Sequence, residues 1–89
     1  MARVIYTPEF DASTIPLGGI AAVQAVIAPL VDVLERDPYV YALQTFSWGA
    51  SFRYATTVAV GDMPALIVAY TIDADGDVLM EFVDRQFSY

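Results

Sequence analysis

The chain has 89 residues, of which 57% are hydrophobic, and 4 basic against 11 acidic side chains give it a formal net charge of −7. It contains no Cys and no His, which excludes a disulfide framework, the usual zinc sites, a catalytic thiolate and a Ser-His-Asp triad. The negative charge argues against broad contact with nucleic-acid phosphates. We therefore expect one domain over residues 1–89, with no metal or cofactor and no direct binding of nucleic acid.

The hydrophobic share is high for so short a chain. A small domain has a large surface relative to its volume, and one Trp, six Tyr and five Phe exceed what a two-layer core of this size needs. This excess predicts an apolar surface that a partner protein or a second copy covers. Residues 20–34 are too short and too interrupted, by Gln24 and Asp32, to cross a bilayer. Because residues 1–9 lack the apolar region of a signal peptide, we expect a cytoplasmic protein without membrane contact.

The first half of the chain reads as a short strand followed by helices. Residues 3–7 are β-formers that end at Pro8, and Thr7 is suited to cap a helical turn over residues 8–13. After a break at residues 16–19, a helix is predicted over residues 19–36. Its expected core stripe is Val23, Ile27, Leu30 and Leu34, widened by Ile20 and Val31. Pro29 lies inside this helix and predicts either a kink or a division into two shorter helices.

The second half reads as β-structure. Short strands are predicted at 41–47, 52–60, 65–72 and 78–83, and residues 84–89 form a tail. Turns at 61–64 and 73–77 join the last three strands, and the apolar run 65–72 belongs in the middle of the sheet. The element order predicts an α+β domain with a helix on one face of a small antiparallel sheet of about four strands.

The turn at residues 73–77 raises the question of a calcium loop. Asp73, Asp75 and Asp77 alternate, but Gly76 stands at the fourth position rather than the sixth, and no Glu follows at the twelfth. Because alternating Asp and Gly between two strands is ordinary hairpin chemistry, we interpret this segment as a turn and predict no metal site.

Motifs spread over the whole chain resemble the RelE/ParE superfamily of toxins from type II toxin–antitoxin systems. Residues 4–9 read Val-Ile-Tyr-Thr-Pro-Glu, 34–38 end in a Leu-x-x-x-Pro step, and 60–62 read Val-Gly-Asp. Residues 70–73 read Tyr-Thr-Ile-Asp, and 82–89 contain an Arg followed four residues later by a Tyr. The resemblance implies an N-terminal helical hairpin packed on the sheet, a bound antitoxin, and a ribosome or DNA gyrase as target.

The same resemblance indicates candidate site residues. Arg85 and Tyr89 match the catalytic pair of the ribonuclease members, but Thr57 and Ala59 stand where those members carry basic side chains. One Arg and one Tyr are a weak set for stabilising a cleaved phosphate on a polyanionic ribosome. We therefore expect a toxin-like protein that inhibits growth by protein contact, rather than an enzyme.

Three side chains are our candidates for contact with such a partner: Arg53, Trp48 and Phe87. Two alternatives stay open: a metal-independent, ribosome-dependent mRNA endoribonuclease that uses Arg85 and Tyr89, and a non-toxic interaction domain that forms homodimers.

Overall fold

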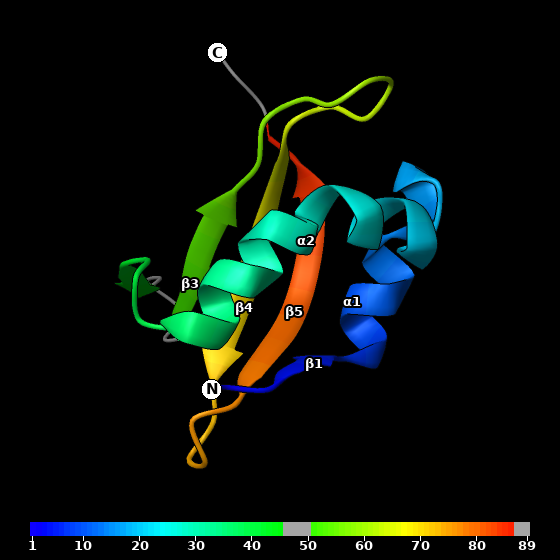
Figure 1. The fold of residues 1–89 in the computed structure, drawn as a ribbon. Coiled ribbons are helices and arrows are strands. Elements are labelled where there is room, and N and C mark those ends of the chain that lie inside the picture. Colours follow the sequence, from blue (N-terminus) through cyan, green and yellow to red (C-terminus); the bar gives the residue numbers. More distant parts are fainter. Residues whose placement is uncertain (46–50, 87–89) are drawn as a thin grey trace.

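The computed structural model describes residues 1–45 and 51–86 (Figure 1). Three helical elements occupy the N-terminal half: α1 (Pro8–Ser13), the 3₁₀ turn η1 (Ile15–Leu17) and α2 (Ile20–Arg36). The strands are β1 (Val4–Tyr6), β2 (Leu43–Thr45), β3 (Ser51–Thr56), β4 (Leu66–Ile72) and β5 (Val78–Arg85). None of the helices in these ranges is long and apolar enough to cross a membrane.

The strands form one sheet in the order β1-β5-β4-β3-β2, with β4 at its centre. The α+β class and the central place of residues 66–72 are confirmed. The sheet differs from the expected one in having five strands and in being mixed, because β1 pairs parallel with β5 while the other pairs are antiparallel. The three-residue strand β1 carries no sequence signal for its partner, so its pairing across the helical region could not be read from the chain.

Helix α2 covers one face of this sheet (Figure 1). The predicted apolar stripe on α2 is buried: Val23, Ile27 and Leu34 are fully buried and Leu30 nearly so. These side chains form one core with buried residues of β3, β4 and β5. Helix α1 packs mainly against β5 instead of lying along α2, so an N-terminal helical hairpin is not confirmed.

The predicted cap of α1 is present. The Thr7 hydroxyl accepts a hydrogen bond from the Phe10 N–H and donates one to the Met80 carbonyl oxygen, at 3.2 and 2.7 Å. Phe10 is fully buried. The cap therefore fixes the start of α1 against β5 as well as within its own turn.

Pro29 does not divide α2, which runs through it for 17 residues. The alternative of two shorter helices is therefore wrong. An interior proline costs about 3 kcal/mol, but Ile27 and Leu30 on either side of it are buried. Burying two such side chains contributes about 1.5–3 kcal/mol each, which offsets the proline's cost.

The strands begin and end at other residues than the alternation predicted. β3 ends at Thr56 instead of residue 60, and β2 covers only Leu43–Thr45. The Thr57 N–H still donates a hydrogen bond to the Leu66 carbonyl oxygen. Beyond Thr57 the chain no longer pairs with β4. β5 extends to Arg85, because Leu66 of β4 still pairs with it. Arg85 therefore ends a strand and does not belong to a tail.

Candidate functional site

The candidate residues from the sequence do not converge on one site within the described residues. Arg53 on β3 pairs with Tyr70 of β4, whereas Arg85 on β5 pairs with Leu66, four positions away along β4. The two arginines therefore lie toward opposite ends of the sheet. The other candidates, Trp48, Phe87 and Tyr89, lie outside the described residues.

Arg53 contacts neutral groups rather than the carboxylate that a lone arginine in an acidic chain would be expected to find. Its Nη1 donates a 2.6 Å hydrogen bond to the Tyr41 carbonyl oxygen, and its guanidinium lies 5.2 Å from the centre of the Tyr39 ring. A cation over an aromatic face is attracted by the ring quadrupole. Arg53 thus fastens β3 to the segment between α2 and β2, which gives this partner-binding candidate a structural task.

Arg85 is exposed at the end of β5. The Asp84 carboxylate accepts a 2.7 Å hydrogen bond from the backbone N–H of Arg85 and not from its guanidinium. Among the described residues, the one ion pair within 4.0 Å is between Arg3 and Asp77. The Arg85 guanidinium is therefore not neutralised by Asp84.

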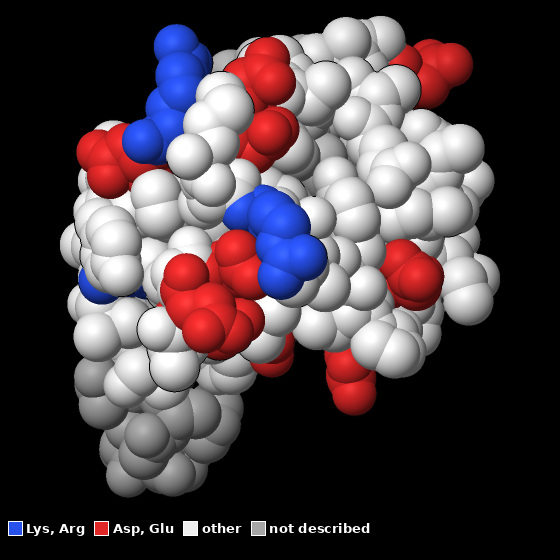
Figure 2. Space-filling model, turned by 60° about the horizontal axis from the view of Figure 1, so that its bottom comes forward, with Lys and Arg blue, Asp and Glu red and all other residues white. Residues whose placement is uncertain are grey.

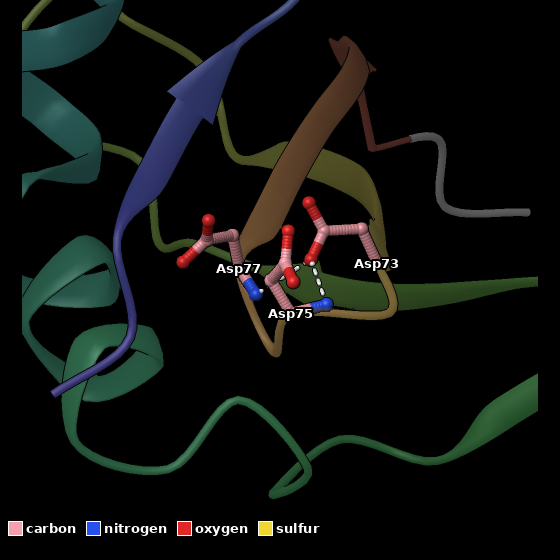
Figure 3. A group of neighbouring side chains, drawn as sticks. All are labelled: Asp73, Asp75 and Asp77. Atoms are coloured by element: carbon pink, nitrogen blue, oxygen red, sulfur yellow. Dashed lines mark hydrogen bonds between the residues drawn. The ribbon is translucent and has the colours of Figure 1, made fainter.

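The acidic turn joins β4 to β5 (Figure 3). The Asp73 Oδ1 accepts hydrogen bonds from the N–H groups of Asp75 and Asp77, each at 2.9 Å. Gly76 has a φ of +83°, a left-handed conformation that favours glycine. This is the geometry of a hairpin turn, as the sequence predicted.

The three carboxylates of this turn offer oxygens within 4.8 Å of one another. The chain itself supplies a cation, since Arg3 Nη2 lies 2.7 Å from Asp77 Oδ2. The hydrogen bond and charge of Arg3 lower the pKa of Asp77, and Asp77 in turn raises the pKa of Arg3. Figure 2 shows acidic side chains spread over this end of the molecule, with basic side chains lying beside some of them.

The strongest candidate site in the described part of the chain is an apolar groove beside α2, which we call the α2 groove. Its volume is about 310 Å³. One wall is formed by α2 and the other by Tyr41, the last residue of β3 and the segment that follows β3. The lining residues are Val26, Pro29, Leu30, Val33, Tyr41, Thr56, Thr57, Val58 and Val60. None of these carries a charge.

The α2 groove follows from the way the chain leaves the sheet after β3. Residues 58–60 no longer pair in the ladder, and the turn at residues 61–62 is closed by the Val60–Met63 bridge. Val58 and Val60 are consequently 76% and 54% exposed. Large exposed apolar side chains beside a concave surface are typical of an interaction site.

Sequence reasoning missed this site because period-two alternation placed Val58 and Val60 in a strand. One signal was present in α2. Val26 and Val33 are apolar but lie outside the predicted core stripe, so the apolar face of this helix is wider than one packing contact needs. Pro29, interpreted only as a source of distortion, is exposed and lines the groove.

Comparison of the chain with protein-family models, with curated proteins and with solved structures gives no match. What the chain does is therefore inferred from the α2 groove, from the placement of the arginines and from the motifs described above.

Proposed function

We propose that the chain is the toxin-like component of a type II toxin–antitoxin system and that it acts by binding proteins. The α2 groove is the observation that carries this proposal. It presents Val58 and Val60 to solvent beside an uncharged wall of α2. Such a surface suits a protein segment far better than it suits RNA, whose phosphates require cations.

The places of the family-like motifs support the same proposal. Thr7 caps α1, and the Val-Gly-Asp motif at residues 60–62 forms the turn between β3 and β4. Residues 70–72 end the central strand and Asp73 follows it directly, while Arg85 ends β5. We take α1 and α2 as the counterparts of the family's helical hairpin, although α1 packs on β5.

The placement of cations favours protein contact over RNA cleavage. Thr57, which stands where nuclease members carry a basic side chain, uses its hydroxyl to accept a 3.0 Å hydrogen bond from the Leu66 N–H. Arg53 is engaged with Tyr41 and Tyr39. Arg85 therefore has no second arginine beside it that could help to stabilise the negative charge of the transition state in phosphodiester cleavage.

Controlled expression in a bacterial host tests the proposal. Induction is expected to arrest growth, and co-expression of the reading frame adjacent to the gene is expected to restore it. Sequencing of cellular RNA should show no new 5′ ends, and a supercoiling assay with purified protein tests a gyrase-type target. Absence of growth arrest would contradict the proposal, whereas message cleavage that Arg85→Ala abolishes would establish the nuclease alternative.

A further inference from the structure

We infer that the α2 groove binds an amphipathic segment of a partner protein that carries basic side chains beyond each end of its apolar face. This inference rests on the proposed function and specifies the chemistry of the partner. It depends on three observations: the uncharged lining of the groove, its length, and the acidic residues that follow its two walls along the chain.

The uncharged lining determines the middle of the partner segment. Val26, Pro29 and Val33 lie on one side of α2, separated by three, four and seven positions, which places them along one face of the helix. Val58 and Val60 face them from the other wall of the groove. A charge buried in such surroundings without a partner is strongly unfavourable. The segment over the groove must therefore present apolar side chains.

The length of the groove limits the segment. From Val26 to Val33, α2 rises about 11 Å at 1.5 Å per residue. Two to three helical turns of a partner would span that distance, with apolar side chains on one face. A segment of about 10 to 14 residues is therefore long enough to fill the groove and extend beyond both ends.

Along the chain, a carboxylate closely follows the last lining residue of α2 and the last lining residue of the opposite wall. Asp37 follows α2, one turn beyond Val33, and its N–H donates to the Val33 carbonyl oxygen at 2.8 Å. Asp62 lies in the turn directly after Val60. Both residues are exposed. Two cations are in this part of the chain: Arg36, whose Nε donates to the Asp32 carbonyl oxygen, and Arg53, which is bound to Tyr41. Asp37 Oδ1 accepts a 3.2 Å hydrogen bond from the Tyr39 N–H, but within residues 1–45 and 51–86 neither carboxylate forms an ion pair, so both can pair with a basic partner.

The charge of the whole chain selects between possible occupants. A second copy would bring another formal charge of −7 to this surface, and the repulsion would oppose association. A basic segment is attracted both by the overall field and by Asp37 and Asp62. A basic amphipathic partner is therefore favoured over a homodimer at the α2 groove.

Binding of designed peptides to the full chain tests this inference. The probe is a fluorescein-labelled 14-residue helix of Leu and Lys in amphipathic order, and the control peptide replaces every Lys by Glu. Fluorescence anisotropy should show binding of the Leu/Lys peptide and none of the Leu/Glu peptide. Equal binding of both peptides would overturn the charge requirement.

Protein variants then locate the binding. Val58→Asp should lower the affinity for the Leu/Lys peptide about ten-fold, although the substitution makes the protein more acidic. Ile15→Asp is the matched control, because Ile15 is 73% exposed against 76% for Val58 and does not line the groove. It should change the affinity less than two-fold. If the two variants bind the Leu/Lys peptide with equal affinity, the peptide is held by general charge attraction and not by the α2 groove, and the inference is wrong.

The end charges are tested in the same way. The double variant Asp37→Asn/Asp62→Asn should weaken binding and reduce its dependence on salt, whereas Glu9→Gln/Asp11→Asn on α1 removes equal charge elsewhere and should have little effect. Sedimentation of the wild type provides a separate check, since a dimer dissociated by Val58→Asp would assign the groove to a second copy. Growth arrest with unchanged peptide binding across all variants would refute this inference and leave the proposed function intact.

Discussion

The hydroxyl of Tyr70 donates a 2.7 Å hydrogen bond to the carbonyl oxygen of Pro38. Tyr70 lies on the central strand β4 and is fully buried, while Pro38 belongs to the segment where α2 has ended. The bond therefore holds the exit of the long helix at a constant position over the sheet. The same segment leads to Tyr41, which lines the α2 groove, so this single contact helps to position one wall of the site.

Replacement of Tyr70 by Phe should lower the free energy of unfolding by about 0.5–1.5 kcal/mol, because the hydroxyl is lost while the ring still packs. Chemical denaturation of the two proteins measures the difference. Tyr39→Phe is the control, since Tyr39 is 61% exposed and its ring, not its hydroxyl, contacts Arg53. An equal effect of both substitutions would show that the bond to Pro38 contributes nothing.

The same tyrosine should make stability depend on alkaline pH. Burial raises the pKa of Tyr70 to about 12, against about 10 in an unfolded chain. Because the pKa of Tyr70 is raised in the folded state, its contribution to the free energy of unfolding is fully present below about pH 10. That contribution is lost as the pH rises toward 12. The stability difference between wild type and Tyr70→Phe should therefore shrink over this interval. Tyr6 and Tyr54, whose pKa values burial also raises, are present in both proteins and cancel.

The pair of Arg3 and Asp77 should act at the acidic end of the pH scale. Since Arg3 lowers the pKa of Asp77, the contribution of the pair is present above the unfolded pKa of about 3.9 and is lost as the pH falls through the lower folded value. Carboxyl NMR titration should place the midpoint of Asp77 below that of a free aspartate, and Arg3→Gln should move it upward. An unchanged midpoint in Arg3→Gln would show that the ion pair does not form in solution.

How much of this fold could be predicted depends on what each sequence pattern encodes. The stripe of Val23, Ile27, Leu30 and Leu34 was predicted correctly, because large apolar side chains at helical spacing are typical of a helix with one buried face. The alternation of side chains wrongly predicted that Val58 and Val60 belong to a strand. Such a pattern indicates which side chains could share one face of a strand, but it does not indicate whether a neighbouring strand continues beside them. The α2 groove exists because the β3–β4 ladder stops there, and that depends on pairing between segments far apart in the chain.

The buried stripe of α2 can be tested by truncation. Ile27→Ala should cost about 2–5 kcal/mol, because Ile27 is fully buried and truncation leaves a cavity against the sheet. Val58→Ala offers the comparison, since a side chain that is 76% exposed should change stability by no more than about 0.5 kcal/mol. Similar losses at both positions in thermal or chemical unfolding would show that the core is not where α2 meets β4 and β5.

Pro29 allows stability and binding to be separated. Proline has no N–H, so the Ala25 carbonyl oxygen lacks the donor it would receive in a regular helix. Pro29→Ala should restore that hydrogen bond and raise the free energy of unfolding by about 1–2 kcal/mol, since part of the cost of about 3 kcal/mol is returned through the freer unfolded chain. Because Pro29 is exposed and lines the α2 groove, the same change removes apolar contact surface. It should therefore weaken binding of the Leu/Lys peptide while stabilising the protein, a stability–function trade-off.

The control for this prediction is Ala28→Ser, at an exposed neighbouring position outside the groove lining, which should leave the affinity for the peptide unchanged. A Pro29→Ala protein that is both more stable and an equally good binder would show that the ring is no part of the binding surface.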